Sequence, residues 1–403
     1  MHQSPAAARS PSVPPADTDR ARQVLEQALA YAADREYTGW DYADGLSSRF
    51  RTALPVENRW LNLAFQEGIK RTPVNVRPLF LVEQRRSFMG AGLFVLVHRI
   101  LDRLPPEHDG FDHRAAACRL ADWLVDNRCR GYSGFCGGHR HDHQHLDHKT
   151  TPAEPDVVTT AVAVKGLLAA ADYDDRYADI ARTAERFLVE DMRYRTVDGT
   201  ARIDYYPQDR PAQHTLNATA MAAQTFLDLY ERVGRDRLRQ RAAALLDFVV
   251  GHQTDRGGWY YRVPASASHL SMDTHHNCFV VESLLRYHEV TGTDRYAESL
   301  ADALAFLRRS LFRADGAPNW DETASYPRDV HAAAQGILAF TAAGDHAFAG
   351  RIVAWLLDTL YVGGGRFAFR KHRLYTERTT LMRWCQAWPC YALATYLQAV
   401  RNR

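Results

Sequence analysis

The stretch from Asp273 to Tyr296, DTHHNCFVVESLLRYHEVTGTDRY, contains the structural unit that decides the fold. A polar start is followed by an apolar segment of helical length, and Gly292 then supplies the left-handed residue that commonly ends a helix. A short Asp-Arg-Tyr turn leads into a second helical segment. The same turn occurs at 175–177 and, as Asp-Arg-Leu after Gly234, at 236–238. The unit is therefore a helical hairpin that repeats along the chain.

Six such units begin with a polar residue, and their starts lie about 54 to 70 residues apart, by difference of the residue numbers. The starts are Arg86, Asp156, His214, Asp273, Asp329 and Arg383. Because each hairpin needs a neighbour to bury its apolar face, the repeat predicts an all-α (α/α)6 toroid with the first helices inside and the second helices outside. The sixth start has no following partner, so we expect a helix over residues 18–34 to complete the ring.

The composition bounds the domain organisation and the class of protein. Residues 1–17 are rich in Pro, Ala and Ser and are expected to form a disordered tail, while 18–403 form a single toroid domain. The tail has no apolar run of signal-peptide length, which favours a cytoplasmic protein.

No apolar run reaches the roughly 20 residues of a membrane span. A net charge of +2 gives no sign of a nucleic-acid partner. The oligomeric state stays open.

Loops rich in glycine and aromatic residues follow the second helices, for example GGWYY at 257–261 and GGGRF at 363–367. We expect short β-like pairings there, at the rim where the inner helices begin. Polar helix starts and loop aromatics should then converge on one bowl. The opposite rim should carry only the short charged turns.

The catalytic candidates are acids and imidazoles near this rim. Asp273 and Asp329 begin an Asp-x-His pattern in neighbouring hairpins, and His276 and His331 lie at similar depth. Each Asp alone is equally explained as an N-cap, which accepts hydrogen bonds from the first helical turn. The segment 39–46 should reach the same rim, so Asp41 and Asp44 are further candidate acids or bases, or simply turn residues.

Further polar and aromatic residues are candidates for substrate binding. The aromatic ones offer flat faces on which sugar rings stack, or they plug hairpin ends. The cationic ones suit an anionic substrate, or they form ordinary surface ion pairs. The candidates are Arg86, His214, Asn217, Trp259, Tyr261, Trp320, Gln335, Arg383 and Gln386.

Metal and cofactor signals are weak. The stretch at 136–148 holds Cys136, His139, His141 and His143, but alternating His-x-His in a mobile loop lacks the spacing of a structural zinc site. No cofactor is expected, and a divalent metal stays an alternative. Cys278 and Cys385 are similar to the zinc cysteines of lanthionine-cyclase-like toroids, although they lie two repeats apart.

Several strings together resemble a little-characterised prokaryotic family of six-hairpin glycosidase-type toroids, linked with surface-glycan or polysaccharide biosynthesis. The strings are GWDYADGLSS, GYSGFCGGHRHDHQ, PDVVTTAVAVKGLL, DTHHNCFVVESLLRYHEVTG, YPRDVHAAAQGI and RWCQAW. The resemblance runs from about Tyr37 to the C-terminus and implies the toroid and a role in carbohydrate chemistry.

The leading hypothesis is a carbohydrate-active enzyme that acts on an acidic, uronate-containing glycan or sugar. A glycoside hydrolase would use Asp273 and Asp329 as its carboxylate pair. A lyase or epimerase would use His276 or His331 as the base, with Arg86, Arg383 or Asn217 holding the enolate charge.

Two other classes stay open. One is a non-catalytic glycan-binding or assembly protein. The other is an isoprenoid cyclase of the class II terpene-cyclase type, to which the Asp-x-Asp-Asp run at 172–175 points although it lies on the expected opposite rim.

Overall fold

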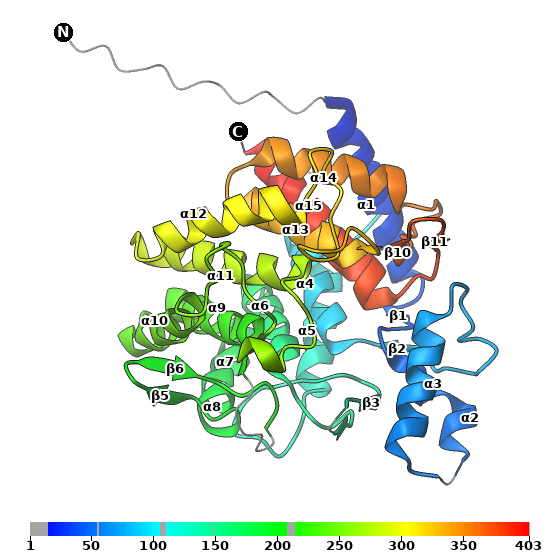
Figure 1. Cartoon of the computed structure of the whole chain (residues 1–403), viewed down its shortest axis with the longest axis horizontal. Coiled ribbons are helices and arrows are strands. Elements are labelled where there is room, and N and C mark those ends of the chain that lie inside the picture. The colour runs from blue at the N-terminus through cyan, green and yellow to red at the C-terminus, as the bar shows by residue number, and fades with distance from the viewer. Residues whose placement is uncertain (1–14, 55, 105–109, 147, 208–213, 403) are drawn as a thin grey trace.

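Inner helices form a closed ring in the computed structural model, which describes residues 15–54, 56–104, 110–146, 148–207 and 214–402 (Figure 1). Each inner helix packs on the next, and the last packs on the first. The inner helices are α4 (Phe88–Arg103), α6 (Val157–Ala170), α9 (Leu216–Val233), α11 (Thr274–Thr291), α13 (Val330–Ala342) and α15 (Trp388–Arg401). The predicted all-α (α/α)6 toroid is confirmed.

Outer helices cover this ring and alternate with the inner ones along the chain. They are α1 (Pro15–Ala33), α5 (His113–Asp126), α7 (Arg176–Arg182) with α8 (Ala184–Arg186) and the π-helix η2 (Phe187–Asp191), α10 (Asp236–Val250), α12 (Ala297–Phe306) with the π-helix η4 (Leu307–Leu311), and α14 (His346–Thr359). Helix α1 packs on α14 and α15, so it completes the sixth hairpin as predicted. It begins at Pro15, three residues inside the predicted tail, and residues 1–14 lie outside the described residues.

The inner helices are apolar on nearly all sides because they contact two neighbours and the outer layer. Helix α6 is an example, since Val157, Val164 and Leu167 are all fully buried. The backbones of α4 and α6 approach closely where two glycines meet: a Cβ on Gly166 would lie 2.9 Å from the carbonyl oxygen of Gly92. The core therefore lies both inside the ring and between its two layers.

Aspartate N-caps start three of the inner helices. Asp156 accepts from the N–H of Thr159 at 2.7 Å, and Asp273 accepts from the N–H of His276 at 3.1 Å. Asp329 caps α13 in the same way. The capping interpretation is thus correct, but one cap leaves most of a carboxylate's acceptor capacity for other partners.

The rim loops contain short antiparallel strand pairs, as predicted. The pairs are β1 (Thr38–Gly39) with β2 (Arg85–Arg86), β3 (His143–Gln144) with β4 (Lys149–Thr150), β5 (Arg195–Val197) with β6 (Thr200–Arg202), β7 (His214–Thr215) with β8 (Arg262–Val263), and β10 (Arg370–Lys371) with both β9 (Arg328–Asp329) and β11 (Thr376–Glu377). Each strand lies in a loop between an outer helix and the next inner helix, and the β7–β8 and β9–β10 pairs each join two successive loops of this kind. They hold the loops over the starts of the inner helices.

A helical lobe, defined as residues 48–82, stands beside the ring and was not predicted (Figure 1). Its helices are α2 (Arg49–Thr52) and α3 (Arg59–Arg71), and it follows the 3-10 helix η1 (Asp44–Ser47). The remaining irregular helices are the 3-10 helix η3 (Ala265–Ala267) and the π-helix η5 (Met382–Ala387), which leads into α15. Among the described residues, none of the helices combines the length and apolar character that crossing a bilayer requires.

Candidate functional site

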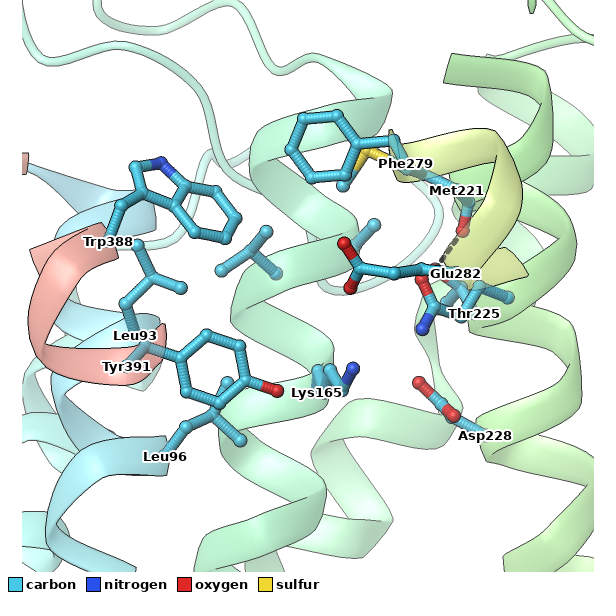
Figure 2. A pocket seen from close by; sticks show the side chains of 13 residues that line it. Leu93, Leu96, Lys165, Met221, Thr225, Asp228, Phe279, Glu282, Trp388 and Tyr391 are labelled. Carbon is cyan, nitrogen blue, oxygen red and sulfur yellow. Dashed lines mark hydrogen bonds between the residues drawn. The ribbon is translucent and has the colours of Figure 1, made fainter. Parts of the chain in front are cut away.

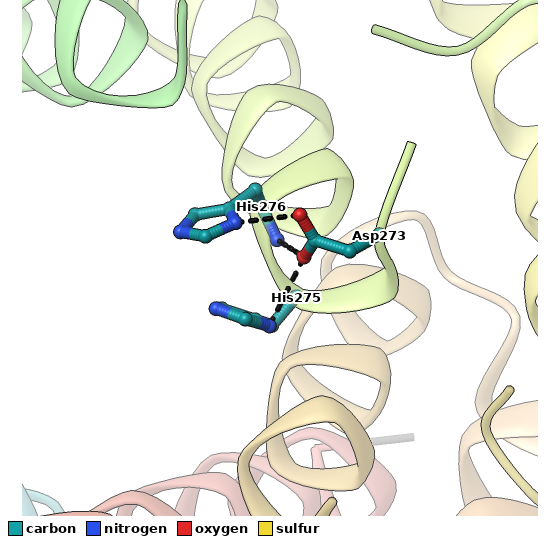
Figure 3. A group of neighbouring side chains, drawn as sticks. All are labelled: Asp273, His275 and His276. Carbon is teal, nitrogen blue, oxygen red and sulfur yellow. Dashed lines mark hydrogen bonds and ion pairs between the residues drawn. The ribbon is translucent and has the colours of Figure 1, made fainter. Parts of the chain in front are cut away.

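The carboxylate of Asp273 holds two histidines at the start of α11 (Figure 3). Nδ1 of His276 lies 2.7 Å from Oδ2, and Nδ1 of His275 lies 3.1 Å from Oδ1. If each Nδ1 carries the proton and donates it to the carboxylate, each Nε2 is left as a basic acceptor. This Asp273–His275–His276 cluster is the centre of the candidate site.

The neighbouring hairpins supply aromatic rings against this cluster. The ring of His331, from the first turn of α13, lies 5.0 Å from that of His275. It stacks on Trp388 at 4.7 Å and meets the edge of Trp384 at 4.4 Å. Tyr261 lies 4.5 Å from the ring of His276 on the other side. The starts of helices α11, α13 and α15 therefore lie close together around this cluster, as predicted.

Both carboxylate oxygens of Asp329 accept hydrogen bonds from neighbouring residues. Its Oδ1 accepts from Trp384 Nε1 at 2.7 Å and from the N–H of His331 at 2.8 Å, and its Oδ2 accepts from Arg370 Nε at 2.7 Å. Burial works against the charge of Arg370, but Asp329 outweighs it and raises the pKa of the guanidinium. The cation of Arg370 also lies 5.0 Å from the ring of Trp320. Asp329 thus positions Trp384 and Arg370.

The segment before the lobe brings two more carboxylates to the same rim, as predicted. Both oxygens of buried Asp41 accept from Nε of Arg383, at 2.9 and 3.0 Å. Burial opposes the charge of Asp41, but Arg383 outweighs it and lowers the carboxyl pKa. Asp44 pairs with Arg77 at 2.7 Å, yet burial prevails there and raises its pKa. Both carboxylates are occupied within the protein.

Burial keeps the imidazoles of His275 and His331 neutral at neutral pH. It lowers the pKa of His275 to about 4, with help from His276 and against the attraction of Asp273. It lowers the pKa of His331 well below the usual value, and His275 and Arg383 add to this. For Asp273, burial alone would raise the pKa, but His276 and His275 outweigh it and lower the pKa to about 2. A neutral imidazole beside an ionised carboxylate is a competent proton acceptor.

Asp156 has a different environment from the other acids. Burial raises its pKa to about 6, although its cap hydrogen bond from Thr159 works in the opposite direction. Its Oδ1 accepts that bond, while Oδ2 is buried and has no hydrogen-bond partner within the protein. Asp156 and Asp273 thus have carboxyl pKa values pushed apart in opposite directions, which is the pattern of an acid and a base in one site.

Six buried polar atoms without a hydrogen-bond partner in the protein lie in the first two turns of the inner helices, and others are spread over the rest of the described chain. Buried polar groups are nearly always paired, so such a gathering marks a surface that meets water or a ligand. The atoms are Asp156 Oδ2, Thr159 Oγ1, Asn217 Oδ1, His331 Nδ1, Gln335 Oε1 and Trp388 Nε1. Among the predicted binding residues, Asn217 and Gln335 belong to this set. Gln335 also lies 3.4 Å from Nε2 of His331.

Two predicted binding residues instead serve the fold. Trp259 is 2% exposed and donates its indole N–H to the carbonyl of Val249 at 2.8 Å, so it plugs a hairpin end. Gln386 is fully buried, accepts from the N–H of Phe367 at 3.1 Å and donates to the carbonyl of Gly365 at 2.5 Å. The expectation that these two face a substrate is therefore wrong.

Two others lie at helix starts but face away from the cluster. The ring of His214 packs on Phe248 of the outer helix α10 at 5.7 Å. Arg86 donates from Nε to the carbonyl of Glu36 at 2.9 Å, and its guanidinium lies 5.2 Å from the ring of Trp123 on α5. Both side chains turn toward the outer layer, so the structure does not join them to the site.

The predicted histidine-rich metal candidates do not converge. Cys136 donates its thiol to the carbonyl of Cys129 at 3.8 Å, and the rings of His139, His141 and His143 lie more than 5 Å apart, at 5.6 and 5.9 Å from His139. The loop is also anchored rather than mobile, through β3 and the lobe. Among the described residues, the one group of three or more side chains whose metal-ligating atoms all come within 4.8 Å of one another is Asp273, His275 and His276.

The other motifs are also placed by the structure. Cys278 and Cys385 are buried free thiols, and Cys385 donates to the carbonyl of Thr379 at 3.8 Å. Asp172 lies past the far end of α6 and pairs with Arg99 at 2.9 Å, so the acidic run is on the rim opposite the site. Neither feature contributes to the cluster.

Sequence reasoning did not select Arg370, Trp384 or Trp388. Trp384 directly follows Arg383, which is the sixth helix start, so the repeat of helix starts already indicated its position at the rim. Arg370 belongs to a loop with several cations, and only the pairing of β9 with β10 places it opposite Asp329. The local sequence contains no sign of that register.

A small, mainly apolar cavity of about 30 Å³ lies deeper in the ring, below the aromatic side chains (Figure 2). Phe279 and Trp388, whose rings are 5.6 Å apart, form part of its wall. Glu282, Lys165 and Tyr391 point into it. Burial raises the pKa of Glu282 to about 7, partly opposed by the charge of Lys165. The cavity is large enough to hold water.

Several solved structures share this architecture. A GH76 α-mannanase of Bacteroides thetaiotaomicron superposes with a TM-score of 0.60 at 14% identity, over 78% of this chain and 86% of that one. A cellobiose 2-epimerase from Bacillus thermoamylovorans gives 0.61 at 12% identity, over 79% and 88%. A family 88 glycosyl hydrolase from Bacteroides vulgatus gives 0.59 at 8% identity, over 96% and 99%. The chain has the six-hairpin glycosidase-like (α/α)6 fold. At these identities the likeness establishes the fold and no residue role. No protein-family model and no curated protein sequence matches the chain.

Proposed function

We propose that this protein is a carbohydrate-active enzyme that moves a proton at a sugar carbon next to a carbonyl or carboxylate group, as an epimerase, isomerase or lyase does. The fold is shared with enzymes named as sugar epimerases and glycoside hydrolases, so both chemistries are compatible with it. The choice between them rests on the side chains of the site.

The observation that carries the proposal is the cluster of Asp273, His275, His276 and His331. Asp273 fixes the two α11 histidines through Nδ1, and burial keeps His275 and His331 neutral. Neutral, oriented imidazoles are the groups that abstract a proton from carbon near pH 7. The indoles of Trp384 and Trp388 beside them provide flat faces for a sugar ring.

The proton balance of an epimerisation is simple in this arrangement. Nε2 of His276 takes the proton from the carbon, and the electron pair of the C–H bond forms an enediolate with the adjacent carbonyl. The charge of Arg383 nearby stabilises the oxyanion. Neutral His331 passes a proton from water to the opposite face of the carbon, and the His276 imidazolium releases the abstracted proton to water, so the protons balance. In a lyase the same enediolate instead expels the leaving sugar oxygen.

The preference for an acidic, uronate-containing substrate is part of this proposal. It depends on which arginine side chains can bind an anionic group. Arg383 and Arg370 each pair with a buried carboxylate, so their charge is already balanced within the protein. Buried Arg328, whose Nε has no protein partner, is the cation that best supports an anionic group. The predicted role in surface-glycan metabolism and the cytoplasmic location also stay predictions.

Hydrolysis of a glycosidic bond is the second candidate, and the environment of Asp156 favours it. A carboxyl group with a pKa of about 6 and one unpartnered oxygen suits a general acid, and ionised Asp273 suits its partner. The pair expected from the sequence, Asp273 with Asp329, fits less well because both Asp329 oxygens are already hydrogen-bonded.

The test is incubation of the protein with neutral and uronate sugars in D₂O, followed by NMR. We expect deuterium at one sugar carbon together with an epimer, a ketose or an unsaturated product. Release of reducing ends without deuterium would replace this proposal by hydrolysis. If no sugar is changed by the wild-type protein, the proposal fails.

A matched pair of variants tests the role of Asp273. Asp273→Asn keeps an N-cap of equal quality but removes the charge that holds His275 and His276, so isotope exchange should fall by about 10²-fold or more with little loss of stability. The control is Asp345→Asn, because Asp345 caps the outer helix α14 by the same type of bond, at 3.1 Å to Phe348. Equal exchange rates in the two variants would remove Asp273 from the mechanism.

A further inference from the structure

The lobe of residues 48–82 exposes an unusual number of large apolar side chains. Leu79 is 74% exposed, Val74 67% and Trp60 63%. The full set in the lobe is Phe50, Leu54, Val56, Trp60, Leu61, Val74, Leu79, Phe80 and Leu81. In the rest of the described chain, side chains of this class are few: Leu146, Tyr326, Leu374 and Tyr375. An exposed apolar surface of this kind marks an interaction site.

The lobe is well anchored on its inner side, so loose packing does not explain the exposure. Buried Arg51 donates from Nε to Asn62 at 2.9 Å. Asn62 and Gln66 both bond Gln144 of the histidine-rich loop, at 3.1 and 3.2 Å. The hydroxyl of Ser48 donates to the carbonyl of Phe80 at 2.5 Å, which ties the two ends of the lobe together. Its outer surface is therefore a defined feature of the fold.

The same lobe is basic at its surface. Residues 48–82 contain six Lys and Arg against two Glu. Arg51 and Arg77 are buried, so the four other cations and the two Glu leave a net charge of +2 toward the outside. Arg49 and Arg71 are largely exposed, at 73% and 77% of their side-chain areas. The guanidinium of Arg59 lies 4.6 Å from the ring of exposed Trp60. Positive charge and apolar area thus occur on one surface.

We propose that this lobe docks the protein on an anionic lipid surface. Protruding Trp, Phe and Leu side chains insert at the boundary between headgroups and acyl chains, and neighbouring Arg and Lys side chains pair with lipid phosphates. Exposures near 70% belong to side chains that project outward, which suits a deformable lipid surface better than a rigid protein groove. Two copies meeting through this lobe would each bring an excess of positive charge, so self-association is disfavoured.

Two ion pairs connect the lobe to the rim that carries the candidate site. Arg77 of the lobe pairs with Asp44, and the adjacent Asp41 pairs with Arg383 of the candidate site. Figure 1 shows the lobe beside β1 and β2, at the rim where the inner helices begin. A lipid surface bound by the lobe therefore lies close to the rim that carries the site.

The experiment is co-sedimentation of the full-length protein with phosphatidylcholine vesicles that contain or lack phosphatidylglycerol. We expect binding to the anionic vesicles only, and weaker binding as salt is added. The double variant Trp60→Ser/Leu79→Ser should reduce binding at least about tenfold, because it removes two of the most exposed apolar side chains of the lobe from the inserting surface. Its control is Leu374→Ser, which changes a 91% exposed leucine outside the lobe.

A charge variant provides an independent readout. Arg59→Gln/Arg71→Gln should weaken anionic-vesicle binding by roughly 5-fold per residue and reduce its salt dependence. The control is Arg313→Gln, which removes an exposed arginine elsewhere. Absence of binding to anionic vesicles, or equal binding to neutral ones, overturns the proposal. A dimer seen by light scattering and abolished by Trp60→Ser/Leu79→Ser also overturns it, because the lobe would then be an interface between two copies.

Discussion

At the residue scale, single aspartates at the starts of inner helices do two jobs with one carboxylate. One oxygen of Asp156 caps α6 and the other is buried without a hydrogen-bond partner. Asp273 caps α11 and also orients two imidazoles. The choice between capping and function, which the sequence left open, is therefore not a real alternative at these positions.

The buried carboxyl of Asp156 predicts a measurable dependence of stability on pH. Its pKa is raised from 3.8 to about 6 in the folded protein, so between these values the native state holds a proton that the unfolded chain has lost. Its contribution to stability is complete below pH 3.8 and is lost as pH rises through 6. The loss amounts to about 2 to 3 kcal/mol.

Urea unfolding of the wild type and Asp156→Asn across this range checks the prediction. Asn keeps the N-cap but does not ionise. The free energy of unfolding of Asp156→Asn should rise relative to that of the wild type between pH 4 and pH 6.5. At higher pH the difference between the two proteins should stay constant. A constant difference across the whole range would show that Asp156 does not titrate there.

At the element scale, the ring depends on close contact between neighbouring inner helices. Gly92 and Gly166 allow the backbones of α4 and α6 to touch, because a Cβ on Gly166 would lie 2.9 Å from the Gly92 carbonyl oxygen. Gly166→Ala should separate the two helices and cost about 1 to 3 kcal/mol of unfolding free energy, despite the higher helix propensity of alanine.

The control for this pair of helices is Gly68→Ala on α3, where the added Cβ meets nothing within 4 Å. That variant should be neutral or more stable by up to about 1 kcal/mol, since alanine favours the helix. Thermal and urea unfolding of both variants give the comparison. Equal effects at the two sites would mean that the α4–α6 contact adapts without strain.

The elements also show which parts of the structure a sequence can reveal. Helix starts, glycine stops and the Asp-Arg-Tyr turns are local signals, so the ring and the position of its polar rim were predicted from them. Arg370 was missed because its approach to Asp329 depends on the register of β9 with β10. Trp259 was misplaced because nothing local distinguishes an aromatic side chain that plugs a hairpin from one that faces a ligand. The lobe was missed because it lies outside the repeat.

At the scale of the whole molecule, ring closure depends on the contact between α1 and the last hairpin. Gly365 makes this contact tight, since it has a φ of +70° and a Cβ there would lie 2.1 Å from the carbonyl oxygen of Gln27 on α1. Gly365→Ala should cost about 2 to 4 kcal/mol, from the left-handed backbone and from displacement of α1.

The adjacent Gly364 separates these two causes. Its φ is +59°, but a Cβ would meet nothing within 4 Å, so Gly364→Ala should cost only about 1 to 2 kcal/mol. Faster proteolysis within α1 in Gly365→Ala, and not in Gly364→Ala, would show that the seam itself has loosened. Identical stability and protease resistance in the two variants would argue against a tight seam.

The seam between the first and last helices also constrains biosynthesis. Arg20 on α1 pairs with Asp358 at the end of α14, 338 residues later, so a nascent chain holds α1 without this partner while the intervening residues are made. Non-local pairing of this kind delays completion of a native structure. The apolar side of α1 therefore stays without its native cover until α14 and α15 have both been synthesised.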